Sequence, residues 1–414
     1  MRAVRFVWVG RGLVAAAIIT FVVVNAFNAL NKGGDASDFF TGGARALRGM
    51  PLYDGSGPAR GFVGPPFQAL FFAPFAAIAE RSEATAKLLW YAISVVSLSC
   101  GLAFWYLACS TAMSRWPLPQ SMHVRNVIVA VAAIILPLQT NFEHQNMNAL
   151  LLCALGAGTW ALMVERPRTA GVLFGCAAAL KVFPALVIVY LGARRLWKAF
   201  FGAVLAAVVL TALPVLIYGP SQFLAQLRAW FQIGSGGWPA RFHNQSLIAA
   251  VDRLTGAWNA PGIRTAGEAP VVVVGFAVIA CALVSLAIIV FSRHEWHVRR
   301  VPNEIASVVV LSILLSPIAW DHYWVLLFPA FLLVRYGAHR ALLGKASTYT
   351  FWVAAGLVSG ISRITVGIAG WNFARRLSVS TVAATLLYVA LLRLSDSTSE
   401  ATHAGLGQQQ PDAP

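Results

Sequence analysis

The chain has 414 residues, of which 58% are hydrophobic and 11% are charged, and its formal net charge is +16. A water-soluble domain of this size could not carry that balance without a large exposed apolar surface, so the composition excludes a soluble globular protein. The Lys and Arg residues fall between apolar runs rather than on one amphipathic face, which argues against nucleic acid as a partner. The five cysteines lack metal-ligand spacing, so the sequence predicts no metal site.

Apolar runs predict an all-α polytopic membrane protein with about 12 transmembrane helices, since a spanning helix needs about 20 mostly apolar residues. The candidate spans are 10–30, 88–109, 126–139, 147–163, 169–180, 183–193, 199–217, 270–291, 304–316, 324–335, 347–361 and 377–393. The run from Pro66 to Ala79 is short and contains Pro74, so it is predicted to lie in the membrane interface. Residues 1–394 form one predicted membrane domain, and 395–414 a polar, disordered cytoplasmic tail.

Charge then fixes the predicted orientation. With 66–79 in the interface, every short basic loop faces the cytoplasm, as the positive-inside rule requires. The loops at 31–87 and 218–269 and the turns at 140–146 and 317–323 face the outer side. We therefore predict a multi-pass protein of the inner (plasma) membrane. Its outer side carries nine of the fifteen acidic residues: Asp35, Asp38, Asp54, Glu80, Glu83, Glu143, Asp252, Glu268 and Asp321.

The stretch 169–193 permits two arrangements. A single span would place Lys181 at its middle, at a cost of about 2.5 to 3.5 kcal/mol on insertion scales. Two short helices that turn at Lys181-Val-Phe-Pro184 avoid this cost. The basic clusters at both ends also require an even number of crossings, so we predict two helices.

Carboxylates follow the first predicted span. Asp38 would lie just beyond the membrane, where an ionised carboxylate can accept a proton from an incoming hydroxyl. Asp35, one helical turn earlier, is a second candidate for this role. The competing interpretation is that Asp38 is a solvated loop acid or the N-cap of the following segment.

A polar turn, Glu143-His144-Gln145-Asn146, separates two apolar helices. Four consecutive hydrogen-bonding side chains exceed what a plain turn needs. They are suited to binding sugar hydroxyls, or equally to satisfying one another and the helix ends. Lys181 would point a cation at the outer interface, where it suits a lipid-linked phosphate; equally, it is a snorkelling residue that anchors a short helix.

Further polar residues lie in two other outer segments. The stretch Ser316 to Trp324 contains Asp321 and His322, and an imidazole can bind or protonate a phosphate oxygen. The alternative is an interfacial aromatic belt with a structural histidine. Asn244 in the second long loop suits carbohydrate, or a loop folded onto the membrane surface. The convergence of these residues on one side of the bilayer favours a site.

Several short motifs in a fixed order resemble glycosyltransferase family 87 of the GT-C superfamily, over about residues 7–393. After Asp38 comes Ala44-Arg-Ala-Leu-x-Gly49-x-Pro-Leu-Tyr53, and then Pro65-Pro66 before an apolar run. The remaining motifs are Gln145-x-x-Asn148, Gly171-x-x-x-Gly175 followed by Lys181-x-x-Pro184, and Ser316-Pro-x-x-Trp320.

The resemblance implies a GT-C fold, with juxtamembrane helices and the catalytic Asp38 in the first periplasmic loop. It implies an inverting transferase that moves a sugar, mannose first among the candidates, from a polyprenyl-phosphate donor to a glycolipid or polysaccharide acceptor. Lys181, His322 and Arg363 would hold the phosphate, and no cofactor or metal is expected. The predicted substrate-binding residues are Asp35, Glu143, His144, Gln145, Asn148, Lys181, Asn244, Asp321, His322 and Arg363.

A transporter or lipid flippase without transferase activity is the rival interpretation, because it would share the hydropathy and the basic inner loops. Such proteins usually carry ionisable residues within their spans and often show inverted repeats. The sequence shows neither feature.

Overall fold

The computed structural model describes residues 2–53, 61–114, 119–235, 243–255, 270–339 and 344–407, and within them it contains helices and no strands. Asp54 and Glu268, two of the predicted outer acids, lie outside this part. The α-helices of the first half are α1 (Arg2–Asn31), α2 (Asp35–Leu47), α3 (Pro66–Ala79), α4 (Glu83–Ala112), α5 (Gln120–Ala133), α6 (Ile135–His144), α7 (Asn148–Met163), α8 (Pro167–Leu180), α9 (Ala185–Ala193) and α10 (Trp197–Ala212).

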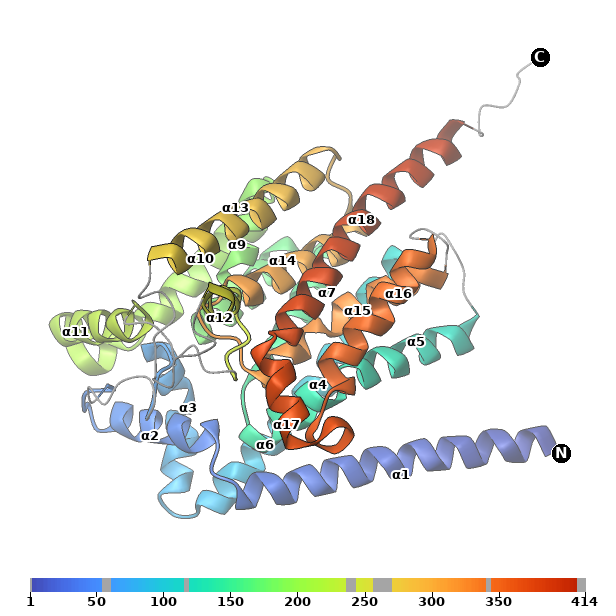
Figure 1. Cartoon of the computed structure of the whole chain (residues 1–414). Helices are drawn as coiled ribbons and strands as arrows, with labels where there is room; N and C mark the ends of the chain where they lie inside the picture. The colour runs from blue at the N-terminus through green and yellow to red at the C-terminus, as the bar shows by residue number, and fades with distance from the viewer. Residues whose placement is uncertain are drawn as a thin grey trace.

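The second half contains α11 (Val215–Ser235), α12 (Leu247–Thr255), α13 (Pro270–Ser292), η2 (Val298–Arg300), α14 (Val301–Leu315), η3 (Asp321–Leu327), α15 (Phe328–His339), α16 (Gly344–Ala355), the π-helical turn η4 (Gly356–Gly360), α17 (Arg363–Arg376) and α18 (Val379–Gly407). In Figure 1, α2, α3 and α11 lie at the left, whereas α1 begins and α18 ends at the right. The helix α18 continues past Ser395, so part of the segment predicted to be disordered is helical.

The all-helical architecture agrees with a polytopic membrane protein, but the predicted count of spans is not confirmed. By length and composition, two helices in the described part, α4 and α13, could each cross a membrane, or up to six if each bent pair is one span. Two predicted spans are broken: 126–139 bends by 59° between α5 and α6, and 199–217 by 88° between α10 and α11. Hydropathy does not register such bends, because apolar residues continue on both sides.

The predicted turn at Lys181 is confirmed, since α8 ends at Leu180 and α9 begins at Ala185. Helix α10 follows α9 after residues 194–196, and its first turns pack on α8. The end of α9 therefore lies near the start of α8, and the two helices form a hairpin that turns at Lys181. Both basic clusters therefore lie at the same end of the hairpin. Helix α9 has nine residues, fewer than half of the roughly 20 that a full crossing needs.

Close packing of α8 on α10 depends on Gly171, one of the glycines in the family motif. A Cβ atom added there would lie 2.2 Å from the Ala199 carbonyl oxygen and 2.9 Å from the Ala203 nitrogen. Small residues at helix interfaces allow backbones to approach in membrane proteins. The absence of a side chain at Gly171 thus sets the distance between these two helices.

We expect Gly171→Ala to destabilise the protein by about 1 to 3 kcal/mol, because the new methyl group must displace backbone atoms of α10. The measurement is the apparent Tm in detergent. Gly356→Ala is the matched control, since a Cβ there meets nothing within 4 Å. Equal Tm values for the two variants would contradict the close approach of α8 and α10.

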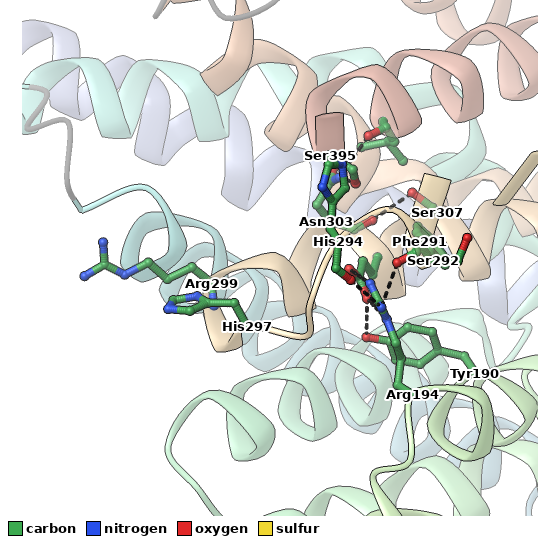
Figure 2. Close-up of polar contacts among 12 residues, drawn as sticks. Tyr190, Arg194, Phe291, Ser292, His294, His297, Arg299, Asn303, Ser307 and Ser395 are labelled. Atoms are coloured by element: carbon green, nitrogen blue, oxygen red, sulfur yellow. Dashed lines mark hydrogen bonds and ion pairs between the residues drawn. The ribbon is translucent and has the colours of Figure 1, made fainter. Parts of the chain in front are cut away.

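A buried ion pair ties α9 to α14 at the other end of the hairpin from Lys181. Arg194 pairs with Glu304, whose side chain is 1% exposed, and Tyr190 donates a hydrogen bond to the same carboxylate at 2.9 Å. The Arg194 guanidinium also donates to the carbonyl oxygens of Phe291 at 2.8 Å and His294 at 3.1 Å, which lie at and after the end of α13 (Figure 2). One side chain thus joins three helices.

Candidate active site

A cavity of about 1340 Å³ lies among α2, the α6–α7 turn, the Lys181 turn, the segment before α15, and α17. The residues that line it are far apart in the sequence, as we expect if the predicted site residues form a single site. Eight of the predicted site residues line it: Asp35, Asp38, Glu143, His144, Lys181, Asp321, His322 and Arg363.

The other three predicted residues, Gln145, Asn148 and Asn244, are buried and do not line the cavity. Gln145 is the left-handed C-cap of α6, and its carbonyl oxygen accepts a hydrogen bond from Trp90 at 2.7 Å. The Asn244 amide donates to the Pro317 carbonyl at 3.0 Å. These residues hold the backbone of the cavity wall.

Asp35 is fixed at the first position of α2 by a close approach of two backbones. A Cβ at Gly34 would lie 2.8 Å from the His144 carbonyl oxygen, so only glycine lets α2 begin against the end of α6. The Asn146 amide nitrogen donates to Asp35 Oδ2 at 2.5 Å, and His322 Nε2 lies 3.7 Å from the same oxygen. The start of α2 thereby brings a carboxylate to the polar turn.

Asp38 lies one turn further along α2, is exposed, and lines the cavity. Partial burial of its carboxyl, and secondly the charge of Asp35, raise the pKa of Asp38 above its ordinary value. The N-cap of α2 is Gly34, so the alternative that Asp38 caps this helix is wrong. Stacking of Phe39 on Phe72 of α3, with ring centroids 4.7 Å apart, holds α2 against α3.

Lys181 lies in the turn between α8 and α9, and its ammonium group points toward the polar turn. Its Nζ donates to Asn146 Oδ1 and to Asn148 Oδ1, both at 3.0 Å, and lies 3.9 Å from the centroid of the Tyr323 ring. Burial lowers the pKa of Lys181 to about 7, and the charge of Asp35 opposes this shift. The cation is therefore engaged with the protein on several sides.

His322 is 5% exposed, and its Nε2 is buried without a hydrogen-bond partner among the described residues. Burial, and after it the charges of Lys181 and His144, lower the pKa of His322 well below its ordinary value. The imidazole is thus neutral at physiological pH, and of the two charge states considered from the sequence this geometry favours the uncharged one. A neutral ring can accept or donate one hydrogen bond to a substrate.

Other cavity residues gave weaker signals in the sequence. Arg375 forms an ion pair with Asp321 and lies 3.6 Å from the centroid of the Trp371 ring, while Arg363 lies 4.4 Å from the same centroid. Asp321 is therefore neutralised by a neighbour. Asn146 belongs to the polar turn, so its sequence position did point to the site, whereas Arg375 and Trp371 follow no motif.

Glu143, also predicted to bind substrate, accepts hydrogen bonds from two sides. Lys32 Nζ lies 3.0 Å from one carboxylate oxygen, and the Gln139 amide donates to the other at 3.1 Å. In the part of the chain that the structure describes, no group of three His, Cys, Asp or Glu residues could hold a metal ion. Independence of metals stays a prediction.

Comparisons with known proteins indicate the family of the chain. The model of glycosyltransferase family 87 matches residues 62–317. A polyprenol-phosphate-mannose-dependent alpha-(1-2)-phosphatidylinositol pentamannoside mannosyltransferase of Mycobacterium tuberculosis (strain CDC 1551 / Oshkosh) is 27% identical over 72% of this chain, which covers 63% of that relative. A polyprenol-phosphate-mannose-dependent alpha-(1-2)-phosphatidylinositol mannoside mannosyltransferase of the same species (strain ATCC 25618 / H37Rv) is 26% identical over 80% of this chain and 76% of its own length. The chain thus spans less than two thirds of the first relative. No solved structure matches it significantly.

Proposed function

The chain belongs to glycosyltransferase family 87, and from this membership we propose that it transfers mannose from a polyprenyl-phosphate donor to a glycolipid acceptor on the outer side of the plasma membrane. The observation that carries the proposal is the cavity in which Asp35 faces His322 and a polar turn. The names of the relatives supply the sugar, the lipid donor and the glycolipid class.

Of the two carboxylates, we assign the role of general base to Asp35 rather than to Asp38, the residue that the sequence suggested. A general base must be held within hydrogen-bond reach of the proton that it removes. Asp35 is oriented through Oδ2 by Asn146, and no described residue donates a hydrogen bond to its Oδ1. That oxygen is available to the acceptor hydroxyl. Asp38 is exposed and has no hydrogen bond to a described side chain.

The reaction is a single displacement that inverts the configuration of the sugar. Asp35 accepts the hydroxyl proton as the acceptor oxygen bonds to the anomeric carbon, and the bond from that carbon to the phosphate oxygen breaks. Polyprenyl phosphate leaves as a stable anion, so no second acid has to protonate it, in contrast to the paired carboxylates of glycoside hydrolases.

The donor phosphate is held by Arg363. This residue lines the cavity, is exposed, and rests on Trp371 without an ion pair to any described carboxylate. Arginine can contact a phosphate with two parallel hydrogen bonds. The other lysines and arginines of the cavity are engaged: Arg375 pairs with Asp321, Lys32 pairs with Glu143, and Lys181 donates to two asparagines.

We expect Arg363→Gln to raise the KM for the lipid donor by about 10- to 100-fold, the effect of losing hydrogen bonds to a charged group, with little change in kcat. Initial rates at varied donor concentration measure it. Arg376→Gln is the matched control, because Arg376 is an exposed arginine of the same helix outside the cavity. A normal donor KM in Arg363→Gln would remove Arg363 from the phosphate site.

The function itself is tested with purified protein in liposomes, supplied with labelled polyprenyl-phosphate mannose and phosphatidylinositol mannosides. We expect the label to appear in the glycolipid. Movement of labelled lipid between leaflets without transfer would favour the rival transporter or flippase. Labelling of a cysteine introduced at Ser37 from the outside alone would support the predicted orientation.

A further inference from the structure

We propose that Lys181 is a positioning residue that orients Asp35 and secures His322, and that it does not bind the lipid phosphate. This inference rests on the proposed function, and it departs from the sequence, which suggested a phosphate ligand. Its basis is the pair of hydrogen-bonded branches that leave the Lys181 ammonium group.

The first branch leads to the carboxylate. Lys181 donates to Asn146 Oδ1, and Asn146 Nδ2 donates to Asp35 Oδ2. An asparagine amide offers one oxygen and one nitrogen, so a cation on the oxygen forces the nitrogen to point at Asp35. The lysine thereby selects the orientation of the amide that holds the carboxylate.

The second branch leads to the histidine. Lys181 also donates to Asn148 Oδ1, and Asn148 Nδ2 donates to the His322 carbonyl oxygen at 2.9 Å. Asn148 is fully buried, so its amide cannot turn to water for another partner. One ammonium group thus fixes both residues that meet at Asp35 Oδ2.

The same contacts leave Lys181 poorly placed to bind a phosphate. An ammonium group has three donors, of which two are given to the asparagines. The Tyr323 ring covers the group at 3.9 Å, which is a favourable cation–π distance. Two of the three donors and one side of the ammonium group are thus already occupied by the protein.

The test separates positioning from phosphate binding by kcat and KM. In Lys181→Met we expect kcat to fall by about 10- to 100-fold, from the loss of hydrogen bonds to a charged group, while the donor KM changes by less than about twofold. Asn146→Ala should lower kcat similarly, and the double variant should be no slower than the slower single one, because both changes break one branch. A raised donor KM with unchanged kcat, or additive losses in the double variant, would overturn the proposal.

Lys87→Met controls for the general loss of a buried lysine. Lys87 also supports α2, since it pairs with Glu83 at 2.8 Å and Glu83 accepts a hydrogen bond from Ser37 at 3.2 Å, but it does not line the cavity. We expect Lys87→Met to keep kcat within about threefold of the wild type, below the effect of a lost charged hydrogen bond. A loss equal to that of Lys181→Met would mean that α2 is merely destabilised. If the proposed function itself is wrong, the wild-type protein will transfer no labelled mannose to the glycolipid.

The pH profile gives a second readout. The groups that face Lys181 are Asp35 from α2, Asn146 from the α6–α7 turn, Asn148 from the start of α7, and His322 and Tyr323 from η3. Because its pKa is lowered to about 7, Lys181 loses its positive charge as the pH rises through 7. The wild-type kcat should therefore decline above pH 7, because the neutral amine keeps two N–H donors for the asparagines but loses the charge that strengthens these hydrogen bonds. The profile of Lys181→Met should lack this decline. A decline that persists in Lys181→Met would overturn the assignment.

Discussion

Replacing Asp35 by Asn is expected to lower the rate of transfer by about 10²- to 10⁴-fold, the usual contribution of a general base. The substitution keeps the shape of the side chain, but an amide cannot accept the proton of the acceptor hydroxyl. Asn146 would also face a second amide in place of the carboxylate to which it now donates at 2.5 Å. The measurement is the initial rate with labelled lipid-linked mannose at saturating donor.

Asp38→Asn is the matched comparison, because it makes the same chemical change one turn further along α2, in a residue that also lines the same cavity. We expect a loss below about tenfold, since removing a nearby charge affects the site only indirectly. The opposite ranking, with Asp38→Asn inactive and Asp35→Asn active, would restore the assignment made from the sequence. Circular dichroism and elution volume show whether both variants are folded.

The second large effect is expected at Arg194. Arg194→Met should destabilise the protein by about 3 to 5 kcal/mol, because it leaves the carboxylate of Glu304 buried without its cation. It also removes the donors to Phe291 and His294, and with them the link from α9 to the end of α13 (Figure 2). The apparent Tm in detergent, followed by intrinsic tryptophan fluorescence, measures the loss.

Two further variants check the cause of this effect. Arg195→Met changes the adjacent, exposed arginine and should leave the Tm nearly unchanged. The double variant Arg194→Met with Glu304→Gln removes both charges, so it should be more stable than Arg194→Met alone. If the double variant is less stable than Arg194→Met, the cost does not come from an unpaired carboxylate.

Local signals in the sequence predicted several elements closely. Pro65 and Pro66 mark the start of α3, and the break at Lys181-Val-Phe-Pro184 follows from the cost of a central charge. The residue types in the polar turn correctly indicated one wall of the cavity. Each of these features depends on neighbours in the chain, which is why the sequence alone contains them.

Features that depend on tertiary contacts could not be predicted in this way. Asp35 and Asp38 differ by one helical turn, and only the approach of Gly34 to His144 places Asp35 at the polar turn. Asn148 and Asn244 belong to polar segments, yet packing turns their side chains into the wall. Arg375 meets Asp321 from a helix that carries no recognisable motif.

The shortness of the α8–α9 hairpin has a consequence for the depth of the reaction. At 1.5 Å per residue, the 14 residues of α8 reach about 21 Å from their basic end, whereas the hydrocarbon layer is about 30 Å thick. If that end lies at the inner surface, as the positive-inside rule predicts, Lys181 stops short of the outer headgroups. We therefore expect sugar transfer to take place in a cavity at the depth of the outer leaflet. There, bulk water has little access to the reacting sugar, and the isoprenoid chain of the donor can stay in the hydrocarbon layer.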